Sequence, residues 1–265
     1  MNVGEALLLA RELGVDRLDA QLLLAHLLQR DRAWLTGHDD APVDEAQARG
    51  LLSRRAAGEP FAYIVGEQEF HGLRLRVTPD TLIPRPDTEL IVDWALELLR
   101  PGQRIVDLGT GSGAIALAIK HGQADAEVHA VDLSPGALGV AQANAERLRL
   151  TVTFHQGNWL APLAGQRFEL IVSNPPYIAA GDAHLPALQH EPLSALTPGG
   201  NGLYDLVAII DAAPAHLSPG GWLLLEHGFD QAEPVADALR ARGFCQVALR
   251  RDLGGQARAS GGRWA

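Results

Sequence analysis

The sequence contains a single cysteine, Cys245, in a chain of 265 residues. One thiol excludes a disulfide within the chain and a metal site built from cysteines, and it is typical of a reducing compartment. Because Cys245 lies in a short apolar run after Phe244, we expect it to be a small core residue. No other residue pattern in the chain implies a bound metal.

Long hydrophobic runs and a basic leader are also absent. No apolar stretch approaches the length that crosses a bilayer, and residues 1–5 lack the positive charge with which a signal peptide begins. We therefore expect a cytoplasmic protein without membrane contacts. Basic residues are few as well, 22 against 32 acidic ones for a net charge of −10, which argues against direct binding of nucleic acid.

The pattern of apolar and polar residues changes along the chain. Residues 1–59 predict a small all-helical domain, with a helical stripe that begins after Asp16 and a second one over 44–57 that stops at Gly58. Residues 60–86 predict a linker, β-like and punctuated by glycines over 61–77 and rich in proline thereafter.

Residues 87–265 predict a second domain in which strand-like runs alternate with helical patterns. Such alternation is typical of a doubly wound, mostly parallel sheet with helices on both faces. Hydrophobic residues make up 47% of the chain, enough to fill a core of this size. The expected strands centre on Val106, Ala130, Phe154, Ile171, Leu224 and Val247.

The most informative segment is Asn174-Pro175-Pro176-Tyr177, which directly follows an apolar run. An asparagine amide carries an acceptor and a donor, and each proline fixes its own φ and removes a backbone N–H. A planar substrate amine would donate to the Asn174 oxygen and the Pro175 carbonyl while Tyr177 lies against its flat face. The alternative interpretation is a strand end followed by a proline-rich turn.

A glycine loop lies upstream of this segment. Asp107 ends a short apolar run that opens onto Gly109-Thr110-Gly111-Ser112-Gly113 and then a helical pattern, an arrangement typical of a nucleotide cradle. An acid at Asp107 is poorly suited to a pyrophosphate, but it suits the cationic groups of S-adenosylmethionine. Asp132, nineteen residues past Gly113, stands where a strand-end acid accepts ribose hydroxyls.

These motifs, in this order, resemble those of the protein-glutamine N5-methyltransferases that modify class I peptide chain release factors. The likeness covers most of the chain, and residues 83–89 are its most family-specific part. The segments that carry it are 63–73, 82–89, 107–113, 158–159, 174–177, 191–192 and 224–228.

The resemblance implies a Rossmann-like class I methyltransferase fold with a seven-stranded sheet, behind a helical domain that contacts the substrate. It implies methyl transfer from S-adenosylmethionine, which leaves S-adenosylhomocysteine, to the side-chain nitrogen of the glutamine in a Gly-Gly-Gln motif. That modification tunes translation termination. The expected partner is a class I release factor, and we expect the enzyme to be a monomer.

Roles for three further residues depend on the resemblance. Asn158 and Trp159, after the third strand, would meet the adenine. Many relatives carry aspartate where this chain has Asn158. The uncharged asparagine should therefore affect the affinity for the cofactor. Trp159 reads equally well as a core aromatic. Arg85, held between two prolines, would stand at the mouth that admits the substrate loop; the alternative is an exposed loop arginine.

Two other functional classes compete with this interpretation. A nucleic acid amino-methyltransferase would use Asn174 to Tyr177 equally well, but the acidic balance and the lack of a basic insert argue against it. A non-catalytic binder of the cofactor would have no use for the intact segment. The chain's own Gly254-Gly255-Gln256 suggests self-methylation, but the surrounding residues fit the family's tail better.

Overall fold

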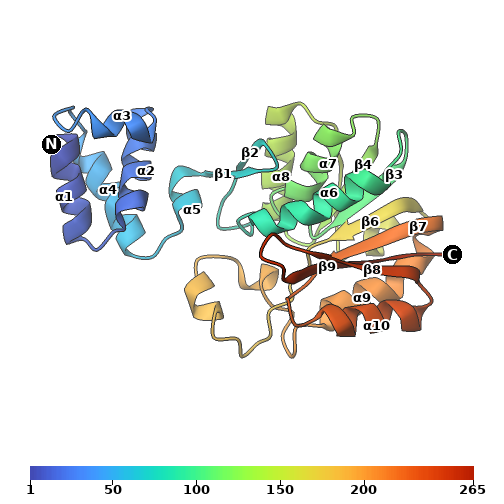
Figure 1. Cartoon of the computed structure of the whole chain (residues 1–265). Helices are drawn as coiled ribbons and strands as arrows, with labels where there is room; N and C mark the ends of the chain where they lie inside the picture. Colours follow the sequence, from blue (N-terminus) through green and yellow to red (C-terminus); the bar gives the residue numbers. More distant parts are fainter. The chain divides into compact units, whose positions relative to one another are not determined.

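The computed structural model describes all residues, 1–265, and the chain divides into two compact units, Met1–Glu67 and Gln68–Ala265. The first unit is helical throughout and the second is built on a seven-stranded sheet (Figure 1). None of the helices combines the length and the apolar character that a bilayer crossing needs.

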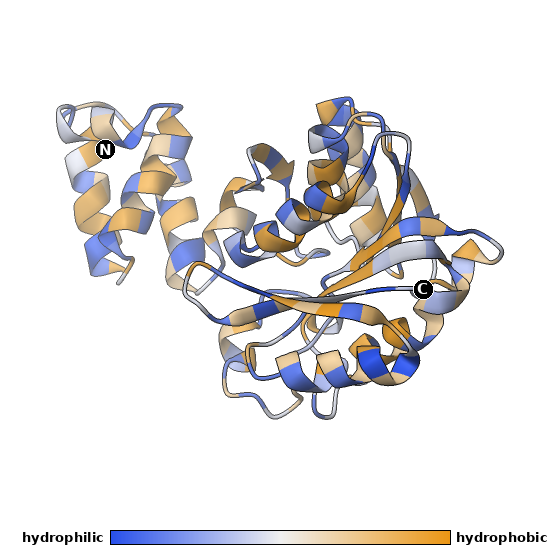
Figure 2. Cartoon of the chain, turned by 45° about the vertical axis from the view of Figure 1, so that its right-hand side comes forward, coloured by the Kyte–Doolittle hydropathy of each residue, from blue (hydrophilic) through white to orange (hydrophobic).

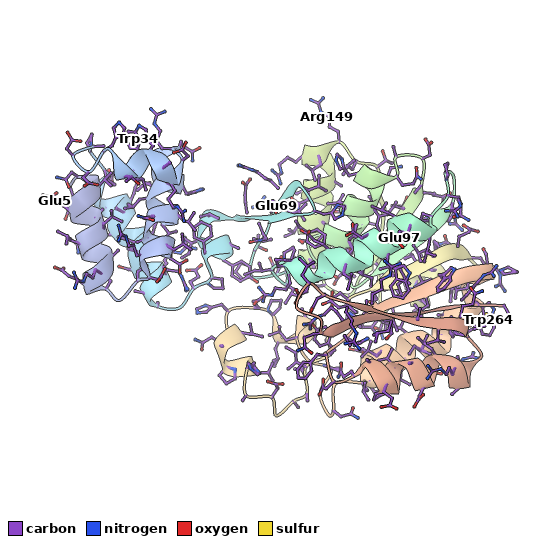
Figure 3. All side chains as sticks on the ribbon, viewed as in Figure 1. Glu5, Trp34, Glu69, Glu97, Arg149 and Trp264 are labelled. Carbon is purple, nitrogen blue, oxygen red and sulfur yellow. The ribbon has the colours of Figure 1, made fainter.

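Side-chain caps define the starts of the first four helices. The side chains of Asn2, Asp16, Asp31 and Asp44 each accept a hydrogen bond from a backbone N–H in the first turn, and such a cap typically contributes about 1 kcal/mol. Trp34, labelled in Figure 3, stacks on the His38 ring with 4.0 Å between ring centroids. The helices are α1 (Val3–Glu12), α2 (Arg17–Leu28), α3 (Arg32–Thr36) and α4 (Glu45–Ala56).

The expectation of a β-like pattern from residue 61 is wrong for its first five residues, which form helix α5 (Phe61–Val65). Phe61, Ile64 and Val65 have the i, i+3, i+4 spacing of one helix face, and they pack into the core of the helical unit. Gly66, with φ of 77°, ends this helix in the left-handed conformation.

A short hairpin and a proline-containing turn begin the second unit. Strands β1 (Glu67–Phe70) and β2 (Leu73–Arg76) pair with each other, and the 3₁₀ turn η1 (Pro86–Thr88) leads directly into α6 (Glu89–Leu98).

The large sheet has the strand order β5-β4-β3-β6-β7-β9-β8, as expected for the predicted fold class. β3 to β7 run parallel, whereas β9 runs antiparallel to both of its neighbours. The strands are β3 (Arg104–Leu108), β4 (Glu127–Asp132), β5 (Thr153–Gln156), β6 (Phe168–Ser173), β7 (Leu217–Glu226), β8 (Cys245–Arg251) and β9 (Ala257–Arg263).

Helices cover both faces of the sheet, so the central strands are apolar on both sides (Figures 1 and 2). Helices α6 and α7, with the end of α8, pack on one face, and α9 and α10 pack on the other. The helices are α7 (Ala114–Gly122), α8 (Pro135–Leu148), α9 (Tyr204–Ala212) and α10 (Ala232–Arg242). The single-turn 3₁₀ segments are η2 (Ala161–Leu163), η3 (Leu185–Leu188), η4 (Leu193–Ala195) and η5 (Ala213–Ala215).

All six expected strand centres lie in strands, but β9 was not expected. It pairs in the interior of the sheet despite a run of small residues, because those residues allow close packing: a Cβ on Gly261 would lie 2.5 Å from Leu224 Cδ2 and 2.9 Å from the Trp94 ring. The expectation that Cys245 is a core residue is wrong. It opens the edge strand β8 and is exposed, and the neighbouring Phe244 is buried instead.

Two glycine substitutions should test this account of the sheet. Gly261→Ala should lower the free energy of unfolding by about 1–3 kcal/mol, because the added methyl group overpacks the contact of β9 with Leu224 and Trp94. Gly139→Ala, at an exposed position in α8 with no atom near the new Cβ, should raise it by about 0.5–1 kcal/mol. Chemical denaturation measures the change in the free energy of unfolding for each variant. Equal changes in the two variants would contradict the close packing of β9.

Candidate active site

The expected site residues meet at the carboxyl ends of the parallel strands. Leu108 of β3 pairs with Val131 of β4 and with Ser173 of β6, and Ser173 pairs with Leu225 of β7. One residue further along, the register therefore places four residues in one row across the sheet. They are Asp132, Gly109, Asn174 and Glu226. Ligands of open α/β sheets bind at this edge.

The glycine loop turns the chain from β3 into α7. Gly109, Gly111 and Gly113 all have positive φ (71°, 56° and 84°), which L-amino acids with a side chain rarely adopt. The N–H groups of Gly109 and Thr110 both bond the Val131 carbonyl at 2.9 Å, which fixes the loop against β4.

Asp107 lies buried beneath this loop, with 1% of its surface exposed. Its Oδ2 accepts hydrogen bonds from the Thr110 hydroxyl (2.6 Å) and the Ala116 N–H (3.2 Å), whereas Oδ1 has no partner in the protein. Burial raises the pKa of Asp107 to about 7, against the opposing effect of these hydrogen bonds. A cation or hydrogen-bond donor near Oδ1 would stabilise the charged form.

Asp132 connects the loop to the start of α8. Its Oδ2 accepts from the Gly111 N–H at 2.8 Å and its Oδ1 accepts from the Ser134 N–H at 2.9 Å. Each carboxylate oxygen can accept more than one hydrogen bond, so a pair of ligand hydroxyls can still bind here.

A cavity of about 460 Å³, within the usual size range for small-molecule sites, opens beside these residues. Seven of the predicted site residues line it: Gly109, Gly111, Asp132, Asn158, Trp159, Asn174 and Pro176. The other predicted residues do not line it: Asp107, Thr110, Ser112, Gly113, Pro175, Tyr177 and Arg85. Of these, Ser112 and Gly113 form the turn into α7, where the Ser112 carbonyl accepts from the Asn144 amide at 2.9 Å.

Asn174 is held by its nitrogen. Its Nδ2 donates to the Thr88 hydroxyl oxygen at 3.2 Å, and its oxygen makes no hydrogen bond within the protein. The side chain thus presents a free acceptor at the cavity wall. Pro175 is buried beside it, and the chain makes no other bond with the Asn174 side chain.

Tyr177 is held through its hydroxyl and its backbone carbonyl. Its hydroxyl donates to Glu226 Oε1 at 3.2 Å, and its backbone carbonyl accepts from the Gln231 amide at 3.0 Å. Burial raises the pKa of the Tyr177 phenol, as does the nearby Glu226 carboxylate. Tyr177 is therefore fixed against β7 in this structure.

Trp159 takes part in both of the arrangements that the sequence left open. It lines the cavity, and it also packs against the core cluster beneath the sheet. A Cβ on Gly109 would lie 3.1 Å from the Trp159 ring, so a glycine is needed where the ring crosses the loop. Burial raises the pKa of Asp205, another cavity residue, and a hydrogen bond from the Trp159 indole opposes that shift.

Arg85 forms an ion pair with Glu191, which is 6% exposed. Glu191 also accepts from the Ile83 N–H at 3.0 Å, and its neighbour Pro192 lines the cavity. The proline-rich segment before α6 is thus tied to the segment after β6. The half-buried arginine is therefore not a free loop residue.

Sequence reasoning missed several residues of the site. Thr88, Glu191 and Glu226 all lie in segments that carry the family resemblance, yet none of them received a role. The missed lining residues are Pro79, Asp80, Thr81, Leu82, Leu133, Ser134, Ala137, Gly157, Pro192, Ser194, Ala195 and Asp205. Only Leu82 and Pro192 among them lie in those segments, so the others carried no signal. Gly254-Gly255-Gln256 forms the turn before β9, where Asp252 accepts from the Gln256 N–H and pairs with Arg258.

The fold and the cavity at this edge of the sheet are those of Rossmann-like methyltransferases. Residues 88–208 match the model of the methyltransferase small domain, and residues 1–66 match the PrmC N-terminal domain. A 16S rRNA N2 G1207 methyltransferase of T. thermophilus, solved with AdoMet and guanosine, has a TM-score of 0.58. It is 21% identical, and the match covers 75% of this chain and 50% of that one, which shows the shared fold.

The comparison with curated proteins is more specific. The release factor glutamine methyltransferase of Bordetella pertussis is 51% identical over 94% of this chain and 95% of the relative. That of Xylella fastidiosa strain Temecula1 is 47% identical over 97% of each chain. The chain belongs to the release factor glutamine methyltransferase family.

The buried Asp107 predicts a pH-dependent stability in the ligand-free protein. Between its ordinary pKa near 3.8 and its folded pKa of about 7, the folded state keeps a proton that the unfolded state has released, so stability falls as pH rises. Asp107→Asn should remove this loss. Its free energy of unfolding should therefore exceed that of the parent by roughly 2–4 kcal/mol at pH 8 and show no such gain at pH 4. Urea denaturation at both pH values checks this; an equal effect at each would contradict the shifted pKa.

Proposed function

We propose that this protein transfers a methyl group from S-adenosylmethionine to the side-chain amide nitrogen of the glutamine in the Gly-Gly-Gln motif of class I release factors. S-adenosylhomocysteine is the second product. The observation that carries the proposal is Asn174, which presents a free amide oxygen at the wall of a cavity that also contains the glycine loop. Family membership over nearly the whole chain supports the choice of substrate.

The residues at this edge fit the cofactor. The buried Asp107 has one oxygen without a partner, and an ammonium held there, directly or through water, would supply the missing charge compensation. Gly109 and Gly111 line the cavity and leave the backbone accessible to the methionine and ribose portion, and Gly113 allows the turn into α7 that shapes the loop. Bound S-adenosylmethionine would supply an electrophilic methyl on a positively charged sulfur.

Other cavity residues complete the proposed cofactor site. Asp132 takes the ribose hydroxyls at its remaining lone pairs, beside the bonds it already accepts from Gly111 and Ser134. Asn158 and Trp159, which also line the cavity, meet the adenine. Thr110 acts indirectly, because its hydroxyl holds Asp107.

The chain's own contribution to catalysis is the orientation of a poor nucleophile. A glutamine amide nitrogen has its lone pair delocalised into the carbonyl, so alignment with the methyl group matters more than basicity. The Asn174 oxygen and the Pro175 carbonyl accept its two N–H bonds, which directs what nucleophilicity remains toward the methyl. Pro176 fixes the backbone so that these acceptors keep their places, and Tyr177 anchors the segment to β7.

We assign release factor recognition to two parts of the chain. The helical unit, residues 1–67, is proposed to contact the release factor, and Arg85 to hold the edge where the substrate loop enters. The net charge of −10 favours a protein partner over nucleic acid. We propose that the enzyme acts as a monomer in the cytoplasm.

The first prediction for this function concerns Asn174. Incubation of an unmethylated release factor with the enzyme and S-adenosylmethionine should add one methyl to the Gly-Gly-Gln glutamine, as read by mass spectrometry of the peptide. Asn174→Ala should abolish the gain and leave the cofactor Kd within about tenfold, at most about 1.4 kcal/mol. Near-normal turnover in this variant would remove Asn174 from its role. A parent enzyme that binds cofactor but methylates only nucleic acid amines would refute the choice of substrate.

The second prediction separates cofactor binding from transfer. Asp132→Ala should raise the cofactor Kd by more than about tenfold, because the ribose loses its acceptors and Gly111 loses the bond that holds the loop. At saturating cofactor, the turnover number of the variant should return to near that of the parent. Calorimetric titration of the cofactor and a saturation curve check the two halves, and an unchanged Kd would place the ribose elsewhere.

A further inference from the structure

We propose that Glu226 determines which end of the Asn174 side-chain amide faces the cavity, acting through the Thr88 hydroxyl as a positioning residue for methyl transfer. This inference depends on the function proposed above, because it concerns the orientation of the substrate amide. Glu226 touches neither substrate nor cofactor in this account. Its effect passes through two hydroxyl groups, those of Thr88 and Tyr177.

Glu226 is placed next to Asn174 by the register of the sheet. It is the last residue of β7, opposite Asn174 in the row that begins at Asp132, and it is 2% exposed. One carboxyl oxygen, Oε1, accepts from the Tyr177 hydroxyl at 3.2 Å. The other, Oε2, is buried and has no hydrogen-bond partner in the protein, and the Thr88 side chain lowers the pKa of Glu226.

The direction of the hydrogen bonds fixes the amide. The Thr88 oxygen accepts from Asn174 Nδ2 at 3.2 Å, so the single hydrogen of that hydroxyl is not used on Asn174 and is free to turn toward the unpartnered Oε2 of Glu226. A carboxylate can only accept, so the ionised form of Glu226 favours this arrangement. The Asn174 oxygen therefore faces the cavity as an acceptor, as an incoming amide N–H requires.

A donor at position 226 would reverse this arrangement. The Thr88 oxygen would then accept from residue 226, and its hydrogen would be free to donate to the Asn174 oxygen. The Asn174 amide would rotate and present its NH₂ group to the substrate NH₂ group, donor against donor. The protein would bind its cofactor normally and lose the acceptor that orients the nucleophile.

The surroundings of Glu226 leave its charge state adjustable. Burial raises the pKa of Glu226 to about 7, the Thr88 and Tyr177 side chains and the charge of Arg258 lower it, and the charge of Asp87 raises it. The Arg258 guanidinium is itself paired with Asp252 at 3.0 Å and Asp87 at 3.4 Å, so it does not pair directly with Glu226.

The other neighbouring titratable group is engaged elsewhere. His227 follows Glu226 in the chain, but its Nε2 lies 2.8 Å from the Ser260 hydroxyl and its Nδ1 lies 2.8 Å from the Gly228 carbonyl. Burial lowers the pKa of His227, so its ring is neutral at and above the ordinary histidine pKa of 6.5. Glu226 therefore has no cation in direct contact. The groups whose hydrogen bonding responds to its charge are the hydroxyls of Thr88 and Tyr177.

Three variants test the proposal with the release factor assay. Thr88→Val, which keeps the shape and removes the hydroxyl, should lower kcat about tenfold or more, and Thr88→Ser should restore it to within about threefold. Glu226→Gln should lower kcat similarly, because its amide can donate to Thr88. In all three variants, the cofactor Kd from calorimetry should stay close to the parent value. The free energy of unfolding at pH 8 should stay close to the parent value in the two Thr88 variants and should rise in Glu226→Gln.

Glu169→Gln is the matched control. Glu169 lies at the other end of β6, where its carboxylate accepts from the Arg104 N–H and the Ser218 hydroxyl, both at 2.8 Å. It shares the chemistry of Glu226 at a distance from the site, so its kcat should equal that of the parent. A loss in this variant as large as that in Glu226→Gln would assign the effect to general destabilisation and overturn the proposal.

The pH profile gives a readout that packing alone would not move. With both substrates saturating, kcat of the parent should rise with pH through about 7 as Glu226 loses its proton and becomes an acceptor only. In Glu226→Gln this step should disappear. Asp107 titrates in the same range, but it lies at the cofactor site, so its effect falls on cofactor affinity and not on turnover at saturation.

The outcomes separate this proposal from the function on which it depends. If the parent enzyme methylates the release factor and Thr88→Val or Glu226→Gln retains the parent kcat, the positioning role is overturned and the function stands. If the Thr88→Ser variant is as inactive as Thr88→Val, the hydroxyl is not what matters and the role also fails. If the parent itself transfers no methyl to the release factor, the proposed function fails first.

Discussion

The site depends on the in-register alignment of parallel strands. Because β3, β4, β6 and β7 all run in the same direction, their carboxyl ends reach one edge, and the pairing brings Asp132, Gly109, Asn174 and Glu226 into a single row. These residues are far apart in the chain, and no loop contact is needed to bring them together. A shift of one residue in any pairing would turn the affected side chain to the opposite face of the sheet.

The sequence predicts most of the fold, and its failures have physical causes. Strands with apolar side chains on both faces are easily found, whereas β9 has alanine, serine and glycine, which have weak strand preference and are favoured there by close packing around Gly261. Helix α5 was missed because Gly66 and Gly72 suggested a hairpin, although Phe61 and Ile64 have helical spacing. Cys245 was misplaced because its strand proved to be the edge of the sheet.

Single motifs in the sequence pointed to residues that line one cavity, whereas contacts that join distant segments were not predicted. The glycine loop, Asp132 and Asn174 are recognisable in the linear sequence, and the cavity brings Gly109, Gly111, Asp132 and Asn174 together. The partner of the Asn174 amide, Thr88, lies 86 residues away, and its bond depends on η1 packing beside β6. Local spacing cannot reveal such a contact, nor the absence of a partner at one oxygen of a buried carboxyl.

Asp132 has a structural role besides the ligand-binding role proposed for it, since its two oxygens already accept from the Gly111 and Ser134 N–H groups. Asn174 has a different status, because its oxygen has no bond within the chain. Over evolutionary time the two positions should therefore respond differently to a loss of function. A descendant without transferase activity would keep the aspartate, because its glycine loop still needs an acceptor, and would let the asparagine drift. The asparagine is thus the better marker of an active member of the lineage.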